Sequence, residues 1–300
     1  MSKQEVILLS KDNYKLSLLV FNAEKPKANI IMVHGMEEHK ERYIDFATFL
    51  QNNHYNVIVS DLRGHGSNAP LLSHISDKYG DELLIEDERI IREYVKREFP
   101  DLPIYLFAHS MGTIISRVLL QEDSKEYAKV ALSGYVNPNP ASGVGLFLTK
   151  FIKLFKGPKG HSKLITNLAV GQFSKKIKNR KTPLDWLSFD EKNVQNYIAD
   201  PLSGVEFTLG SYVTLFSLMK KMGKPNRYHN INKELPFLLI GGEEDPCTGY
   251  EKGRKASYNN LIKAGFTKIE VNTLKHMRHE ILNETDKQKV YEDILKFFNK

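Results

Sequence analysis

The chain has 300 residues, of which 41% are hydrophobic and 26% charged, and its formal net charge is +7. These values suit one large globular domain with room for an inserted subdomain, and no apolar run approaches the ~20 residues that a membrane-spanning helix needs. One cysteine excludes an intramolecular disulfide, and the first residues lack a signal-peptide pattern, so we expect a cytoplasmic protein.

Strands and helices alternate over the first part of the chain. Apolar β-branched and aromatic runs indicate strands, and apolar residues at helical spacing indicate helices. Alternation of this kind favours a parallel sheet with helices on both faces. The sequence predicts a hairpin within residues 5–21, strands at 28–33, 56–60, 104–108 and 129–133, and helices near 43–50, 81–98 and 111–120.

The alternation stops near residue 137 and resumes at residue 236. Residues 137–230 have an irregular helical pattern with Gly and Pro interruptions. The sequence predicts an α/β fold with a mostly parallel eight-stranded sheet flanked by helices and a helical cap after the sixth strand. The core would comprise residues 1–136 and 231–300, and the cap residues 137–230; the last elements expected are strands at 236–242 and 268–273 and helices at 251–264 and 286–299.

Positive charge is concentrated in the predicted cap. Residues 137–230 contain 15 Lys and Arg against 5 Asp and Glu, a net +10, whereas the rest of the chain has a net −3. A basic segment is typical of contact with nucleic acid, with an anionic membrane surface, or with solvent alone. No nucleic-acid-binding motif is present, so we expect no nucleic-acid partner and a transient contact with anionic membrane, which would make the cytoplasmic protein peripheral at the membrane.

One serine follows a strand and precedes a helix. Ser110 is flanked by His109 and Met111, with the small residues Ala108 and Gly112 two positions away on either side. A serine at a tight strand-to-helix turn is the geometry of a nucleophile elbow, where strand and helix approach closely. Taken alone, the pentad is equally typical of a serine that caps an ordinary helix.

An acid and a histidine follow later strands. A serine hydroxyl needs a base within hydrogen-bond reach and a group that orients the base, and such groups project from the carboxyl ends of strands. Asp245 follows the strand at 236–242, where Glu243 and Glu244 compete with it, and His279 follows the strand at 268–273, where His276 competes. The order Ser110, Asp245, His279 is typical of the nucleophile–acid–histidine order of hydrolases.

Four separated segments together resemble the monoglyceride lipase and lysophospholipase branch of the α/β-hydrolases, also described as serine aminopeptidase-like. The resemblance implies that Ser110, Asp245 and His279 form a catalytic triad, and that the backbone N–H groups of Met36 and Met111 form the oxyanion hole. It implies neither a cofactor nor a metal. The segments are His34–His39 with Arg42 and Tyr43, Asp61–Gly66, His109–Gly112 and Met277–Glu284.

The chain departs from this family at two positions of the elbow. Ala108 stands where glycine is usual and adds a methyl group at a crowded turn, and Thr113 stands where a further glycine is frequent. Neither change removes a catalytic group.

Elsewhere, we expect His34 and the loop residues Asp61, Arg63 and His65 to be structural, and a Glu38–Arg42 pair at i, i+4 to support the following helix.

Two further features leave alternatives open. Cys247 lies two residues after Asp245 and is either a small packed residue or a thiol-sensitive position. The other feature is the segment 144–156, whose aromatic face is edged by lysines and either packs on the core or lies in a lipid interface. We assign its apolar face to substrate or lid contacts: Phe147, Phe151, Leu154 and Phe155.

The predicted function is that of a serine ester hydrolase acting on a single-acyl lipid, a monoacylglycerol or a lysophospholipid. The same triad serves a short-chain carboxylesterase or a prolyl-type aminopeptidase. An aminopeptidase needs acidic groups near the site to hold the substrate ammonium, and the basic, apolar cap favours a lipid instead. A protein that binds lipid or a partner without catalysis is the alternative from another class.

Overall fold

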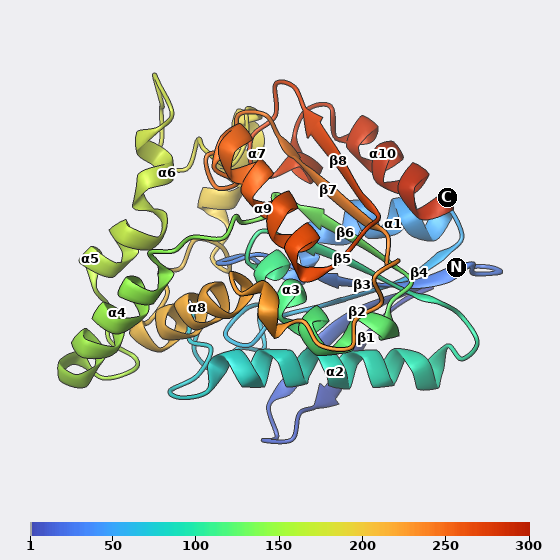
Figure 1. Cartoon of the computed structure of the whole chain (residues 1–300), viewed down its shortest axis with the longest axis horizontal. Coiled ribbons are helices and arrows are strands. Elements are labelled where there is room, and N and C mark those ends of the chain that lie inside the picture. The colour runs from blue at the N-terminus through green and yellow to red at the C-terminus, as the bar shows by residue number, and fades with distance from the viewer. Residues whose placement is uncertain (1) are drawn as a thin grey trace.

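The computed structural model describes residues 2–300 and has one eight-stranded sheet at its centre (Figure 1). The strand order is β1-β2-β4-β3-β5-β6-β7-β8; β1 and β2 pair antiparallel, as do β2 and β4, and the remaining pairs are parallel. The predicted fold class is therefore confirmed. The strands are β1 Ser2–Leu9, β2 Lys15–Asn22, β3 Ala28–Val33, β4 Tyr55–Ser60, β5 Ile104–His109, β6 Lys129–Ser133, β7 Phe237–Gly242 and β8 Ile269–Leu274.

Helices cover both faces of the sheet. Because successive side chains of a strand point to opposite faces, β3 sends Ile31 and Val33 into one apolar cluster and Ile30 and Met32 into the other. Helices α1 and α10 cover the second cluster, and α2, α3 and α9 cover the first. Their bounds are α1 Ile44–Asn52, α2 Gly80–Glu98, α3 Met111–Asp123, α9 Tyr250–Ala264 and α10 Lys287–Asn299, with single 3-10 turns at Lys40–Tyr43, Ser124–Glu126, Pro225–Arg227 and Ile281–Asn283.

Helices also fill the chain between β6 and β7. These are α4 Ser142–Lys156, α5 Lys163–Thr166, a π-helical turn Asn167–Gly171, α6 Gln172–Lys175, α7 Glu191–Ala199 and α8 Leu209–Met222. Figure 1 shows α4, α5 and α6 stacked at one end of the molecule, beside the sheet. Helix α8 packs against α4 and also against α2 and α3 of the predicted core, and the division into core and cap stays a prediction.

The helices of the molecule are short or amphipathic. Among the described residues, none is both long enough and apolar enough to cross a membrane.

Candidate active site

Ser110 lies between β5 and α3, as the elbow prediction required. Its backbone φ of +51° is in the left-handed region, which residues with a Cβ rarely adopt outside strained turns. Helix α3 comes close to β3 at this point: a Cβ added to Gly112 would lie 2.2 Å from the carbonyl oxygen of Val33. Ala108 is fully buried in the apolar core, so the extra methyl group is accommodated.

The structure brings Ser110, His279 and Asp245 into one chain of hydrogen bonds. Ser110 Oγ is 2.8 Å from His279 Nε2, and His279 Nδ1 is 2.9 Å from Asp245 Oδ2. Because a carboxylate only accepts hydrogen bonds, Nδ1 carries the proton and Nε2 is free to accept from the serine hydroxyl. The other oxygen of Asp245 accepts a hydrogen bond from the backbone N–H of Cys247 at 2.7 Å.

The competing candidates lie outside this chain of hydrogen bonds. Glu243, Glu244 and His276 are exposed, whereas Asp245 and His279 are buried. A base that is to receive a proton from a nucleophile must lie within hydrogen-bond reach of it. His279 meets that requirement toward Ser110.

The environment of His279 makes it a stronger base. Burial of the imidazole lowers its pKa, but the Asp245 carboxylate, followed by Glu280 and Glu38, outweighs this effect and raises the pKa above the ordinary 6.5. The neighbouring His109 is different: burial lowers its pKa to about 4. His109 is therefore neutral at pH 7, and His279 is the imidazole suited to gain a proton.

Hydrogen bonds made by its own side chains hold the loop after β3 in place. Glu38 Oε1 accepts hydrogen bonds from the backbone N–H of Gly35 at 2.6 Å and from the hydroxyl of Tyr43 at 2.9 Å. His34 bridges two loops, because its Nε2 accepts from the backbone N–H of Leu62 at 2.9 Å while its Nδ1 lies 2.8 Å from the carbonyl oxygen of Gly35. Burial lowers the pKa of His34 to about 3, so it stays neutral.

Asp61, Arg63 and His65, which we expected to be structural, form hydrogen bonds with other parts of the chain. Asp61 accepts hydrogen bonds from the backbone N–H and the ammonium group of Lys40. Arg63 bridges Asp12 and Asp87. His65 Nε2 accepts a hydrogen bond from the backbone N–H of Glu37 at 3.2 Å, so His65 supports the same loop as Glu38.

Arg42 joins the Glu38 loop to the His279 loop. Its guanidinium donates to Glu38 at 3.0 Å and to both oxygens of Glu280 at 2.6 and 2.7 Å, the bidentate geometry that makes such pairs strong. The same group lies 4.8 Å above the ring of Tyr197 and 3.3 Å from Asn193 Oδ1, both on α7. The predicted Glu38–Arg42 pair is thus part of a larger network that includes the segment between β6 and β7.

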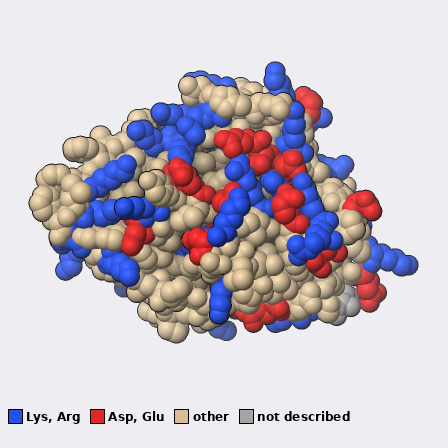
Figure 2. Space-filling view, turned by 90° about the horizontal axis from the view of Figure 1, so that it is seen from below, with Lys and Arg blue, Asp and Glu red and all other residues tan. Residues whose placement is uncertain are grey.

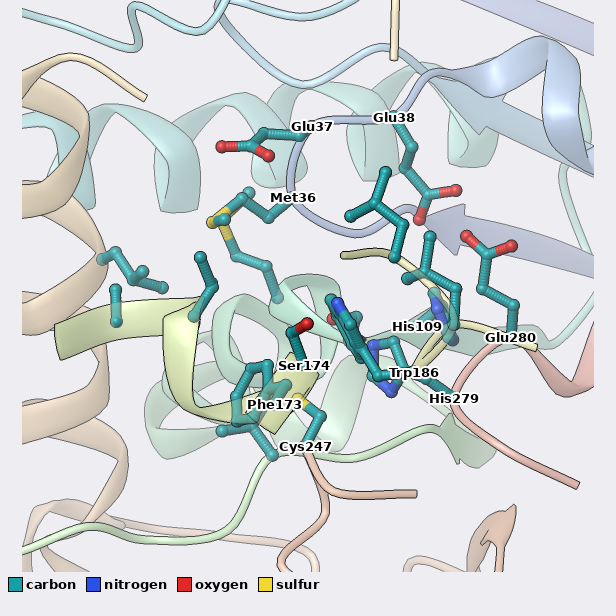
Figure 3. Close-up of a pocket in the computed structure, with 18 of the residues that line it drawn as sticks. Met36, Glu37, Glu38, His109, Phe173, Ser174, Trp186, Cys247, His279 and Glu280 are labelled. Atoms are coloured by element: carbon teal, nitrogen blue, oxygen red, sulfur yellow. Dashed lines mark hydrogen bonds between the residues drawn. The ribbon is translucent and has the colours of Figure 1, made fainter. Parts of the chain in front are cut away.

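Ser110 and His279 line a cavity of about 250 Å³, and Figure 3 shows His279 among the residues around it. Its wall is largely apolar, and much of it comes from the segment between β6 and β7. Met36 and Met111, whose N–H groups the resemblance assigns to the oxyanion hole, both line it beside Ser110; that role stays a prediction. The other residues that line it include Ile114, Ala169, Val170, Phe173, Leu184, Trp186, Leu187, Leu215 and Met219.

Several cavity residues were not identified from the sequence. Trp186, the one tryptophan of the chain, packs against the His279 ring with the ring centres 5.0 Å apart. Glu37 and Glu280 also line the cavity. The sequence offered only weak indications of them, because Trp186 lies in the irregular segment, and Glu37 and Glu280 lie within the segments His34–His39 and Met277–Glu284 but have no role assigned to them there.

The four α4 residues assigned to substrate or lid contacts do not reach this cavity. Phe147, Phe151, Leu154 and Phe155 are 73%, 52%, 80% and 77% exposed, so this face is open to solvent, although the helix itself packs against α8. The opposite face of α4 makes the packing contact: Gly145 lies so close to α8 that an added Cβ would be 2.7 Å from the ring of Phe216.

One cluster in residues 2–300 has three metal-ligating side chains with donor atoms within 4.8 Å of one another, namely Asp245, Cys247 and His279. Asp245 and His279 already bond to each other, and His279 also bonds to Ser110. Cys247 is buried, which raises the pKa of its thiol well above the usual range. The thiol is therefore protonated and unsuited to bind a cation at neutral pH.

Comparisons with known proteins identify the family of this chain. A family model described as serine aminopeptidase, S33, matches residues 24–286. Monoglyceride lipase of Mus musculus is 26% identical over 226 residues, which cover 73% of this chain and 66% of the mouse protein. Monoacylglycerol lipase of Mycolicibacterium smegmatis is 24% identical over 270 residues, which cover 90% of this chain and 87% of that protein.

Solved structures are similar over the whole chain. A thermostable carboxyl esterase from Bacillus coagulans, in complex with glycerol, aligns with a TM-score of 0.92 and 25% identity over 100% of this chain and 98% of the esterase. A lipase described as being in its open form aligns with a TM-score of 0.88 and 22% identity over 99% and 98% of the two chains. The second likeness concerns the fold alone.

Proposed function

Because the chain belongs to the serine aminopeptidase S33 family of α/β-hydrolases, we propose that it is a serine hydrolase that cleaves single-acyl lipid esters, such as a monoacylglycerol or a lysophospholipid. One observation carries the proposal: the hydrogen-bonded chain from Ser110 through His279 to Asp245 at the floor of a largely apolar cavity.

The reaction proceeds in two halves. Ser110 Oγ attacks the ester carbonyl carbon while His279 Nε2 takes the hydroxyl proton, and the carbonyl oxygen becomes an oxyanion that the N–H groups of Met36 and Met111 bind. The intermediate collapses, His279 returns the proton to the departing alcohol, and the acyl group stays on Ser110. A water molecule then repeats the sequence, which releases the carboxylic acid and regenerates the serine.

Each triad member has a defined part in this scheme. Asp245 holds the imidazole of His279 in the tautomer that accepts at Nε2, and it stabilises the imidazolium that forms. Arg42 acts through Glu38 and Glu280 and is a positioning residue for the oxyanion loop and the base loop. Residues 137–230 would form the cap, since they supply much of the cavity wall.

The apolar wall favours a lipid ester over a peptide. An N-terminal peptide substrate needs a free carboxylate for its ammonium group. The cap is basic, but the cavity itself contains acidic side chains, because Glu37, Glu38 and Glu280 all line it. Two of them, Glu38 and Glu280, share the single cation of Arg42. Burial raises the pKa of Glu37 to about 8, so the one carboxyl group of the three that lacks a cation is largely protonated at pH 7 and poorly suited to hold an ammonium.

We also propose that the exposed face of α4 contacts an anionic membrane surface. The exposed rings of Phe151 and Phe155 meet edge to face, with their centres 5.3 Å apart, and Leu164 and Leu168, just beyond α4, are also exposed. Figure 2 shows several lysine and arginine side chains among uncharged residues at the end of the molecule where this segment lies. An amphipathic helix with aromatic residues on one face and lysines at its edges suits a lipid interface.

Fatty-acid release tests the assignment directly. A 1-monoacylglycerol, a short-chain p-nitrophenyl ester and a prolyl amide would be compared for the wild type, Ser110→Ala, His279→Ala and, as the matched control, His276→Ala. We expect turnover of both esters, loss of about 10³-fold or more in the first two variants, and little change in His276→Ala. Faster turnover of the monoacylglycerol than of the short ester would favour a lipase over a general esterase.

Other outcomes would contradict the proposal. Turnover of the amide alone would make the protein a peptidase. Absence of turnover, together with failure of a fluorophosphonate to label Ser110, would support a binding protein without catalysis.

A further inference from the structure

Glu37 occupies a backbone conformation that its side chain does not favour. It follows Met36 in the loop after β3, with a φ of +57°, where glycine would be unstrained and residues with a Cβ are disfavoured. Such outliers persist where the surrounding structure holds them, often at functional sites. Tyr197 from α7 holds this one, because its hydroxyl donates to the carbonyl oxygen of Glu37 at 2.7 Å.

The carboxyl group of Glu37 lies on the cavity wall without a cation. Figure 3 shows it pointing away from Glu38 and Glu280, which lie together on the other side of the cavity. Those two carboxylates share the guanidinium of Arg42, whereas no Lys or Arg in residues 2–300 forms an ion pair with Glu37. The backbone N–H of Phe207 donates one hydrogen bond to Glu37 Oε1 at 3.2 Å, so the group retains capacity to bind a polar ligand.

We propose that Glu37 recognises the alcohol part of the substrate: its carboxyl group binds a hydroxyl of an uncharged polyol ester, such as a monoacylglycerol, and disfavours an ester with an anionic headgroup. This inference rests on the proposed function, and it selects between the two lipid classes named there. A few polar groups on an otherwise apolar wall orient a ligand and set its specificity.

The position of Glu37 explains why the alcohol is its target. The N–H group of its neighbour Met36 is assigned to the carbonyl oxygen of the ester. Glu37 therefore follows, by one residue, a residue of the reacting centre. An acyl chain gains nothing from a carboxyl group, since desolvating a polar group without a hydrogen bond is unfavourable. The apolar residues Leu215 and Met219 on the same wall suit the chain instead.

The charge of Glu37 depends on pH near neutrality. Burial raises its pKa to about 8, and the nearby Glu206 adds to this effect. The groups around the carboxyl are Glu206 and Lys163 in an adjoining surface pocket, Tyr197 from α7 and Tyr212 from α8. Below pH 8 the protonated carboxyl both donates and accepts hydrogen bonds, and above it the carboxylate repels an anionic headgroup.

The test compares three esters of the same acyl chain: the glycerol ester, the methyl ester, which has no hydroxyl, and lysophosphatidylglycerol, whose phosphodiester stays singly negative. The variants are Glu37→Gly, which relieves the backbone strain, Glu37→Gln, which keeps hydrogen bonding but not charge, and the exposed control Glu292→Gln on α10. Ratios of kcat/KM between esters cancel the titration of His279, which all three share.

We expect Glu37→Gly to lower the glycerol-to-methyl ratio by ~3- to 10-fold, mostly through KM, as loss of one hydrogen bond would. Glu37→Gln should keep that ratio. In the wild type, discrimination against lysophosphatidylglycerol relative to the glycerol ester should grow as the pH rises through 8, and in Glu37→Gln it should stay flat. Glu292→Gln should match the wild type in every ratio.

Two results would overturn the inference while leaving the proposed function intact: an unchanged glycerol-to-methyl ratio in Glu37→Gly, or the same pH dependence of discrimination in Glu37→Gln as in the wild type. If the wild type hydrolyses none of the esters, the proposed function fails instead. A binding measurement then tests Glu37. The monoacylglycerol is titrated into the single variant Ser110→Ala and into the double variant Ser110→Ala with Glu37→Gly, and binding is followed by the fluorescence of Trp186, which lines the same cavity. Equal affinity of these two proteins for the monoacylglycerol would refute the recognition role.

Discussion

At the scale of single residues, the carboxyl groups around Ser110 differ in the partners to which each is bonded. Asp245 is buried and bonds to His279, so its effect is concentrated on the base. Glu38 and Glu280 lie near the same imidazole but share the guanidinium of Arg42, which limits their influence. Glu37 has no such cation. Carboxyl groups that lie within one cavity thus serve different purposes because their partners differ.

The acid limb of activity should follow His279. The base works when Nε2 is unprotonated, and the folded protein holds the pKa of His279 above 6.5. Activity should therefore rise with pH through a midpoint above 6.5 and be lost as the pH falls below it. Asp245→Asn removes the main group that raises the pKa, so burial should then shift the midpoint below 6.5, and the rate should drop by about 10⁴-fold.

For the wild type, the midpoint is read from the pH profile of kcat/KM for a short-chain ester. For the slow variant Asp245→Asn, it is read from the pH dependence of the rate at which a fluorophosphonate labels Ser110. Glu243→Gln, an exposed carboxylate in the same loop, is the control and should leave the midpoint in place. A wild-type midpoint well below 6.5 would contradict the assignment of His279 as the base.

At the scale of elements, the elbow depends on how closely α3 approaches β3. The contact is between backbones: a Cβ at position 112 would meet the carbonyl oxygens of Val33 and His34 at 2.2 and 2.6 Å. Backbone atoms cannot rotate aside as a flexible side chain can. The glycine at the helix side of the elbow is therefore required by packing, whereas position 108 accommodates alanine within the core.

Gly112→Ala should push α3 away from β3 and destabilise the protein by about 1–3 kcal/mol, as overpacking of a tight interior does, with a loss of activity because Ser110 moves with the helix. Gly143→Ala on α4 is the matched control, since nothing lies within 4 Å of a Cβ there. It should be neutral or more stable by about 0.5–1 kcal/mol. Urea unfolding measures the stability of both variants. Equal stability would show that the close approach of α3 to β3 does not restrict residue 112 to glycine.

At the scale of the whole molecule, the segment between β6 and β7 has two separate surfaces. One lines the cavity with residues such as Phe173 and Trp186. The other exposes Phe147 and Phe155 of α4 to solvent, on the side where positive charge gathers (Figure 2). The proposed contacts with substrate and with a membrane surface would thus be made by different residues of the same segment.

Binding to vesicles tests the second surface. Phe151→Ser with Phe155→Ser should weaken sedimentation with phosphatidylglycerol-containing vesicles by about tenfold or more, because burying each aromatic side chain contributes about 1.5–3 kcal/mol. Lys150→Gln with Lys156→Gln should instead remove the preference for these vesicles over pure phosphatidylcholine. Val271→Ser, an exposed apolar position on β8, is the control. Equal binding by all proteins would contradict membrane contact through α4.

The sequence by itself determined the order and type of the elements outside residues 137–230, because buried strands and amphipathic helices have recognisable periodicities. It also determined the elbow, since a strand, a serine and a helix adjoin along the chain. It placed Asp245 and His279 after the correct strands, and parallel strands of one sheet end at one edge. That is why three residues far apart in sequence could be expected to meet.

Only the tertiary structure decided which of the neighbouring candidates meet. His276 and His279 follow the same strand, but the turn between them buries one and exposes the other. The residues of the cavity wall, Trp186 and Glu37 among them, depend on how an irregular segment folds back over the sheet, which no local periodicity encodes. The same holds for α4, whose two faces are distinguished by what packs against them: Gly145 meets Phe216 of α8, and the aromatic face meets none of the core.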